Sequence, residues 1–141
     1  MTRQGIFKHV VEFMRKQGKR AVSEPSTTAS APGELAPYNG CLYAAPDGSK
    51  CAIGCLPTFP SRLKDSHGGV YQLIKQMTGQ EVMYLLPRDA LVEDAESFLA
   101  DVQDRLHDRL SVSFLEQLET AAQGFAREHE LIYEPPKGVV A

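Results

Sequence analysis

Residues 89–110, DALVEDAESFLADVQDRLHDRL, carry the clearest helical pattern in the chain. Apolar side chains recur every three or four residues along them, which is the spacing of one face of an α-helix. Carboxylates crowd the first turns, where the helix dipole favours negative charge. The stretch therefore predicts a long amphipathic helix that buries one stripe in a core. That stripe consists of Leu91, Ala95, Phe98, Leu99, Val102, Leu106 and Leu110.

Two further stretches predict helices that pack against the first. Residues 5–17, GIFKHVVEFMRKQ, repeat the helical spacing and are followed by Gly18 in the position of a C-terminal cap. Residues 113–130 begin with Ser113 in the spacing of a capping box and continue with apolar residues at helical spacing. We expect the helices 89–110 and 113–130 to be antiparallel and joined by a short turn, with the first helix against them.

The remaining segments predict short elements and a loop. Residues 70–77 predict a short helix that ends at Gly79, and residues 81–86 fit either a short strand or the start of the next helix. Residues 23–37 hold three prolines and five serines or threonines with almost nothing to bury, which predicts a flexible surface loop. That loop is too short to separate two domains, so we expect a single domain over residues 1–141.

Residues 41–55 predict a β-hairpin. The segments CLYAA and KCAIGC flank Pro-Asp-Gly-Ser, which is a turn signal between two runs of small and apolar residues. With a two-residue loop, Cys41 lies on the opposite face from Cys51 and Cys55; with a three-residue loop, it lies directly across from Cys55. The sequence does not choose between these registers. The expected fold class is therefore α+β, mostly α-helical, with a small antiparallel β-hairpin packed on a helical bundle.

The three cysteines of the chain all lie in this segment, and they allow more than one interpretation. Small buried thiols are the ordinary one, because free cysteine is among the most often buried residue types. A zinc site needs about four ligands, and the paired Cys-x2-Cys spacing of structural zinc sites is missing. A disulfide is disfavoured in a reducing cytosol. We expect reduced thiols with no metal or cofactor; a zinc site would use Cys41, Cys51, Cys55 and His67.

The sequence contains no convincing catalytic constellation. Cys55, with His67 downstream, is the best candidate for a nucleophile and its base. His107 and Asp108 resemble the dipeptide of metal-dependent phosphohydrolases, but those sites need further ligands, and an exposed ion pair of His107 with Asp104 is the simpler expectation. The chain has neither a phosphate-binding glycine-rich loop nor a Gly-x-Ser-x-Gly motif. We expect a protein that is not an enzyme.

Residues 41–56, CLYAAPDGSKCAIGCL, resemble the signature of a widespread group of short proteins of phages, prophages and plasmids. In that group a Cys-x-Tyr strand, a glycine turn and a Cys-Ala-(Ile/Val)-Gly-x-Leu strand recur in this order. The resemblance continues into FLADVQDRLHD and FLEQLETAAQGFAREHEL and covers most of the chain apart from residues 23–37, although PTFP at 57–60 replaces the usual Pro-Asp-Glu-Leu-Tyr. It implies a mobile-element origin and no mechanism. The matching residues are Cys41, Tyr43, Gly48, Cys51, Ala52, Gly54, Leu56, Gln103, His107, Asp108, Phe125, Ala126, His129 and Leu131.

Charge is unevenly distributed along the chain. Residues 1–20 carry six basic groups against one acid, whereas residues 89–134 carry twelve carboxylates against three arginines. Acids on the helix 89–110 could imitate nucleic-acid phosphates to the basic groove of a host protein, and a solvated helix face is the simpler alternative. The candidate partner-binding residues are Asp89, Glu93, Asp94, Glu96 and Asp101.

These features favour a non-enzymatic phage or prophage accessory protein that binds a host protein, such as an anti-CRISPR-like inhibitor of a nucleic-acid-targeting defence complex. The alternatives are a nucleic-acid-binding accessory protein and a small structural zinc-binding protein. No apolar run approaches the roughly 20 residues of a membrane span, so we expect a soluble protein of the bacterial cytoplasm with no membrane contact. Nucleic acid would meet the basic end of the first helix, although the helix dipole also explains those charges. They are Arg15, Lys16, Lys19 and Arg20.

Overall fold

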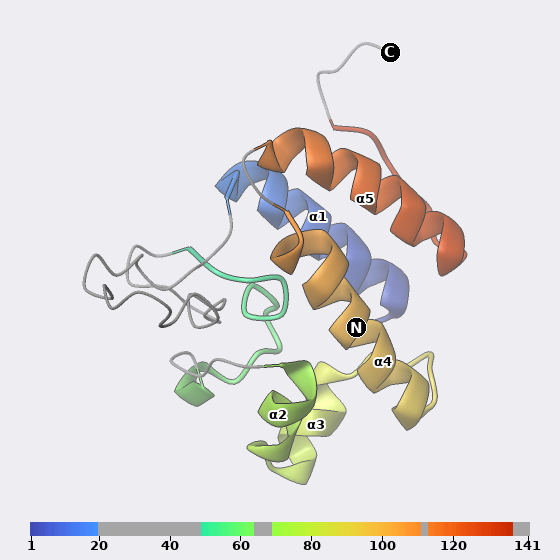
Figure 1. The fold of residues 1–141 in the computed structure, drawn as a ribbon. Coiled ribbons are helices and arrows are strands. Elements are labelled where there is room, and N and C mark those ends of the chain that lie inside the picture. The colour runs from blue at the N-terminus through green and yellow to red at the C-terminus, as the bar shows by residue number, and fades with distance from the viewer. Residues whose placement is uncertain (20–48, 64–68, 111–112, 137–141) are drawn as a thin grey trace, which may run out of the picture.

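The computed structural model describes residues 1–19, 49–63, 69–110 and 113–136, and this part of the chain is mostly helical. Three long helical segments lie side by side, and two short helices sit near the start of one of them (Figure 1). The long segments are α1 (Arg3–Gln17), α4 (Val92–Gln103) with its continuation η3 (Asp104–Asp108), and α5 (Phe114–Glu128). The shorter elements are η2 (Ser61–Leu63), α2 (Val70–Lys75) and α3 (Gly79–Leu85).

Helix α5 runs antiparallel to both of the other long segments (Figure 1). The ring of Phe7 stacks on Phe125, and Arg15 pairs with Glu119, so residue numbers rise along α1 as they fall along α5. The end of α4 and η3 meet α5 in the same reversed order. The predicted antiparallel arrangement of the last two helices is therefore confirmed, and α1 and α4 are parallel to each other.

The helix predicted at residues 5–17 is confirmed, and its two ends show the expected capping chemistry. The Thr2 hydroxyl accepts a hydrogen bond from the backbone N–H of Gly5 at 3.0 Å, which satisfies a donor of the first turn. At the other end, Gly18 has a φ of 70° and donates its N–H to the carbonyl of Met14 at 2.8 Å. Glycine adopts this left-handed conformation without the steric cost that a Cβ would add.

The capping box that the sequence predicts at Ser113 is wrong, because Ser113 makes no capping hydrogen bond within the described residues. A complete capping box instead begins α3. There the backbone N–H of Glu81 bonds to the Thr78 hydroxyl at 3.2 Å, and the Glu81 carboxylate accepts the N–H of Thr78 at 2.9 Å. Of the two interpretations of residues 81–86, the start of a helix is confirmed, since residues 81–85 lie in α3.

The β-hairpin predicted at residues 41–55 is wrong. Residues 51–59 form consecutive tight turns, in which the N–H of Cys55 bonds to the carbonyl of Cys51 at 3.0 Å and later N–H groups bond three residues back. Their donors are thus satisfied locally and not by a partner strand. The described part of the chain contains no strand, so helices and turns replace the predicted α+β class; residues 41–48 lie outside that part.

Burial explains why this segment turns. All side chains from Cys51 to Leu56 are buried, whereas a strand lying on a helical bundle buries alternate side chains and exposes the others. The segment packs against α1 and the end of α4, where the N–H of Ile53 is bound by a side chain of α4 and the carbonyl of Cys55 by a side chain of α1.

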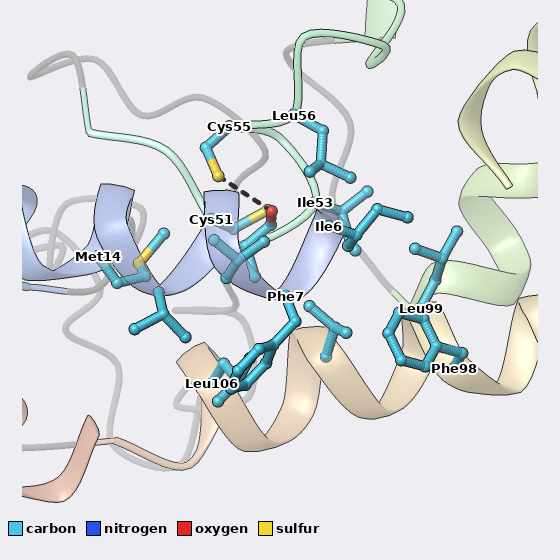
Figure 2. Close-up of a cluster of buried hydrophobic side chains, with 14 of the residues drawn as sticks. Ile6, Phe7, Met14, Cys51, Ile53, Cys55, Leu56, Phe98, Leu99 and Leu106 are labelled. Carbon is cyan, nitrogen blue, oxygen red and sulfur yellow. Dashed lines mark hydrogen bonds between the residues drawn. The ribbon is translucent and has the colours of Figure 1, made fainter. Parts of the chain in front are cut away.

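Phe125 lies at the centre of the core. Its ring stacks on Phe7 of α1, with centroids 5.5 Å apart and planes within 4°, and meets Phe98 of α4 edge to face at 5.5 Å. Figure 2 shows part of the core, in which Ile53 of the turn segment and Leu106 of η3 lie among the buried side chains next to α1. One apolar cluster therefore joins all three long segments and the turns.

The helix predicted at residues 89–110 begins later and changes its winding near its end. Leu91 stands at the N-cap of α4 and is 78% exposed, so its predicted place in the buried stripe is wrong. From Asp104 to Asp108 the chain winds as a π-helix, with one residue more per hydrogen-bonded turn. Two consecutive residues of this turn, Leu106 and His107, face the core, and both are 0% exposed.

Substitutions of two leucines in α5 separate the contribution of core packing to stability from that of helix propensity. We expect Leu118→Ala to lower the free energy of unfolding by about 2–5 kcal/mol, because Leu118 is 0% exposed and its removal leaves a cavity. Leu115→Ala makes the same change of helix propensity at a side chain that is 49% exposed, and we expect it to cost about 1 kcal/mol or less. Urea unfolding measures both. Equal losses would contradict the packing described here.

Candidate functional site

The five acids predicted as a partner-binding surface have different environments in the structure. Glu93 and Asp94 are exposed in the first turn of α4, and neither forms an ion pair within the described residues. Glu96 is half-buried in the same helix. Asp89 and Asp101 are bound to basic side chains of the chain itself. The sequence thus predicted one surface, and the structure leaves two of its members as accessible unpaired charges.

Asp89 joins the start of α1 to the segment before α4. Its carboxylate accepts the backbone N–H of Arg3 at 2.9 Å and the Arg3 side-chain Nε at 3.4 Å. Desolvation raises the pKa of Asp89, but the hydrogen bonds and the charge of Arg3 outweigh it, so the pKa lies below its usual value. The neighbouring Arg88 N–H bonds to the carbonyl of Met1 at 3.0 Å. Asp89 therefore helps to hold the start of α1 against the segment before α4.

Asp101 belongs to a cluster that joins α4, η3 and α5. One of its oxygens lies 2.8 Å from Nε2 of His129 and 3.3 Å from the Arg105 guanidinium. Arg105 also contacts Glu128 and lies over the ring of Phe125 at 5.6 Å from its centroid. Asp101 is consequently occupied within the fold, and its exchange would disturb the packing of α5.

A cleft of about 440 Å³ opens beside the acids at the start of α4. Leu91 lies at this cleft with most of its side chain in solvent, and the buried ring of Phe98 also lines it. The cleft thus combines apolar groups, the ion pair of Arg3 with Asp89, and the exposed carboxylate of Asp94, which suits a side chain with an apolar stem and a basic head that reaches Asp94. The lining residues are Arg3, Asp89, Ala90, Leu91, Asp94, Ser97, Phe98 and His129.

The basic end of α1, predicted as the alternative nucleic-acid surface, is partly used by the fold. Arg15 donates two hydrogen bonds to the Glu119 carboxylate, each of 2.7 Å, and a third to the carbonyl of Glu134 at 2.7 Å. Lys16 and Lys19 are exposed, and Arg20 lies outside the described residues. Arg15 is thus engaged with carboxylate and carbonyl groups that a phosphate would have to displace.

Cys51 and Cys55 are buried thiols, as the ordinary interpretation of the sequence expects. The thiol of Cys55 donates to the carbonyl of Ala52 at 3.2 Å (Figure 2), and Sγ of Cys51 accepts the N–H of Gly54 at 3.3 Å. Burial raises the pKa of Cys55 to about 12 and that of Cys51 further still. Both sulfurs therefore stay protonated near neutral pH, whereas a nucleophilic cysteine needs a lowered pKa.

The predicted zinc site cannot be assembled from the described residues. Only Cys51 and Cys55 of its four ligands belong to them, since Cys41 and His67 lie outside. Across the part of the chain that the structure describes, no three His, Cys, Asp and Glu side chains are grouped so as to hold a metal ion.

A buried polar cluster, which the sequence reasoning missed, lies where the turn segment meets η3. Gln103 accepts the N–H of Ile53 through its side-chain oxygen at 3.1 Å and donates to the Asp108 carboxylate at 2.7 Å. Nδ1 of His107 lies 2.9 Å from the same carboxylate oxygen. The expected exposed ion pair of His107 with Asp104 is wrong, because His107 is 0% exposed and its Nδ1 faces the Asp108 carboxylate. Gln103, His107 and Asp108 all belong to the residues on which the resemblance rests, which was the one signal that could have found them.

Comparisons with protein-family models, with curated proteins and with solved structures gave no match for this chain. The mobile-element origin thus stays a prediction from the sequence. None of the described helices has both the length and the apolar character needed to cross a membrane.

The pair of Arg15 and Glu119 makes stability depend on pH. Desolvation raises the pKa of Glu119, but hydrogen bonds from Arg15 and Tyr133 outweigh it, so the pKa of the folded state is lowered. We expect Glu119→Gln to cost on the order of 1 kcal/mol at pH 7. That difference is fully present above the ordinary pKa of 4.5 and shrinks as pH falls towards the lowered pKa.

Urea unfolding of both proteins between pH 3 and pH 7 measures this effect. Glu116→Gln, at an exposed position of the same helix, is the matched control and should show no such pH dependence. A constant difference between wild type and Glu119→Gln over this range would contradict the assignment.

The two buried thiols should be protected from alkylation. At pH 8, a pKa of about 12 leaves about one Cys55 sulfur in ten thousand as thiolate, and the surrounding core also excludes the reagent. We expect Cys51 and Cys55 to react at least about 100-fold more slowly in the native protein than in denaturant. Peptide mass spectrometry after iodoacetamide labelling gives the rate at each site. Rapid native labelling of Cys55 would revive the catalytic interpretation.

Proposed function

We propose that this chain is a non-catalytic phage or prophage accessory protein that binds a host protein in the bacterial cytoplasm through the start of α4. The observation that carries the proposal is the combination of Glu93 and Asp94, exposed without an ion pair in the described residues, with the exposed Leu91 beside them. Unpaired carboxylates attract a basic partner over long range, and an exposed leucine supplies apolar area once contact is made.

A basic groove that binds nucleic acid is the partner surface that fits this arrangement best. Carboxylates on a helix can take the place of phosphates in such a groove, which is how an anti-CRISPR-like inhibitor of a nucleic-acid-targeting defence complex would act. The cleft next to Leu91 adds a place for a basic side chain of the partner. The resemblance to mobile-element proteins supports the same proposal, and it is the reason for proposing a bacterial host.

The chemistry of the described residues supports binding over catalysis. The two described thiols have raised pKa values, which disfavours a nucleophile. The ionisable groups around the cleft are largely paired within the fold, as Arg3 is with Asp89 and His129 with Asp101. Paired groups position the helices, and they leave Glu93 and Asp94 as the accessible charges.

The test is charge reversal restricted to accessible acids. We expect Glu93→Lys with Asp94→Lys to abolish capture of the partner from a bacterial host lysate, or to weaken it at least about tenfold. Glu12→Lys with Glu116→Lys makes the same change of net charge at other exposed positions and should keep the partner. Asp89 and Asp101 stay unchanged, because reversing them would break contacts that hold α1 and α5.

Affinity purification of the three proteins, with circular dichroism to verify folding, gives the answer. Equal capture by the wild type and the Glu93 and Asp94 variant would refute the acidic-surface mechanism. If no protein is captured while the purified chain shifts duplex DNA with a steep salt dependence, the basic residues Lys16 and Lys19 become the binding surface instead.

A further inference from the structure

The segment that follows α5 lies along α1 and is held there mainly through its backbone. Gln4 of α1 accepts the N–H of Ile132 at 2.8 Å and donates to the Ile132 carbonyl at 3.0 Å. Arg15 of α1 donates to the carbonyl of Glu134 at 2.7 Å. A small cavity remains between α1 and residues 132–134. We call residues 131–136 the tail.

One side chain of the tail is also specifically bound. The Tyr133 hydroxyl donates to the Glu119 carboxylate at 2.6 Å, and the Arg15 guanidinium lies 5.8 Å from the centre of the Tyr133 ring. The surface of α1 and α5 that binds the tail, which we call its groove, is therefore matched to the tail at both its main chain and its tyrosine. All these groups belong to α1 or to the body of α5, so they offer the same contacts to the identical tail of a second copy.

The residue that turns the chain from α5 into the tail is in an unfavourable conformation. Glu130 has a φ of 57°, and within the described residues it is the only non-glycine residue with a positive φ. The N–H of Leu131 bonds to the carbonyl of Ala126 at 2.8 Å, which closes the helix in the manner usually served by glycine. A side chain at this position makes the closed turn costly.

We propose that the tail exchanges between two copies of this chain, so that each tail occupies the groove on α1 of the other copy. When the tail leaves its own groove, Glu130 can return to an ordinary negative φ, which removes the cost at both turns of the dimer. Pro135 and Pro136 keep the end of the tail extended whether it is bound or free, so little order has to be regained. This surface and its partner are separate from the acidic start of α4.

Concentration decides between the two forms. A tail attached to its own groove has an effective concentration in the millimolar range, so dilute protein stays monomeric. Refolding from denaturant at high protein concentration lets tails meet other grooves before they close on their own, which is the usual route to exchanged dimers. We expect a dimer after refolding at about 1 mM that persists on rapid dilution, because exchange back requires local unfolding.

The first test is Glu130→Gly, which removes the cost of the positive φ and keeps the closed monomer foldable. We expect it to raise the dissociation constant of the refolded dimer at least about tenfold relative to wild type, as measured by sedimentation. Gln123→Gly, at an exposed position within α5, is the control that weakens the helix without touching the turn. No dimer in refolded wild type, or an unchanged constant in Glu130→Gly, would overturn the proposal.

The second test asks whether the tail and the groove are the parts that join the copies. Gln4→Ala damages only the groove, and Ile132→Pro with Tyr133→Phe damages only the tail. Refolded together, these two proteins can form one intact tail-and-groove pair, which neither can form alone. Native mass spectrometry should show mixed dimers well above the statistical half. A statistical mixture, or strong dimers of each variant alone, would mean that another surface joins the copies.

Discussion

The ring of Phe125 is the contact on which the rest of the structure depends. It touches α1 through Phe7 and α4 through Phe98, and the guanidinium of Arg105 lies over it. His129, one turn further along α5, packs against the same ring at 4.2 Å and binds Asp101. Aromatic contacts of this kind add to the burial of apolar area. The orientation of all three long segments is therefore set around one side chain, with the charged groups arranged at its edge.

A second connection, between the turn segment and the end of α4, lies next to the π turn of residues 104–108. Leu106 and His107 are both buried at this turn, and Nδ1 of His107 lies 2.9 Å from the Asp108 carboxylate. Gln103 then holds the N–H of Ile53 at one end and the Asp108 carboxylate at the other. A buried N–H without an acceptor is costly, so the turn segment depends on this one glutamine for its closest polar contact with α4.

Helical periodicity made the three long segments predictable, because apolar residues spaced for one face need a core to cover them. The same reasoning failed for residues 51–56. Every side chain there is buried, so the apolar residues do not alternate with polar ones in a way that indicates a helix or a strand. It also failed for Asp89 and Asp101, because a partner such as Arg3 lies far away in sequence and only the fold brings it near. The sequence could show which acids lie on the helix, but it could not show which of their charges are already paired with basic groups in the fold.

The parallel arrangement of α1 and α4 has an electrostatic consequence for the acidic surface. The bundle places two helix N-termini and one C-terminus at the same end, so the half-charges of the backbone do not cancel there. Asp89 faces one of those positive ends, and Glu93 and Asp94 occupy the other. At the opposite end, Arg15 and Lys16 meet the negative end of α1. The uneven charge of the sequence thus compensates the unequal number of helices pointing each way. A partner therefore meets a weaker negative field at the start of α4 than the number of carboxylates suggests.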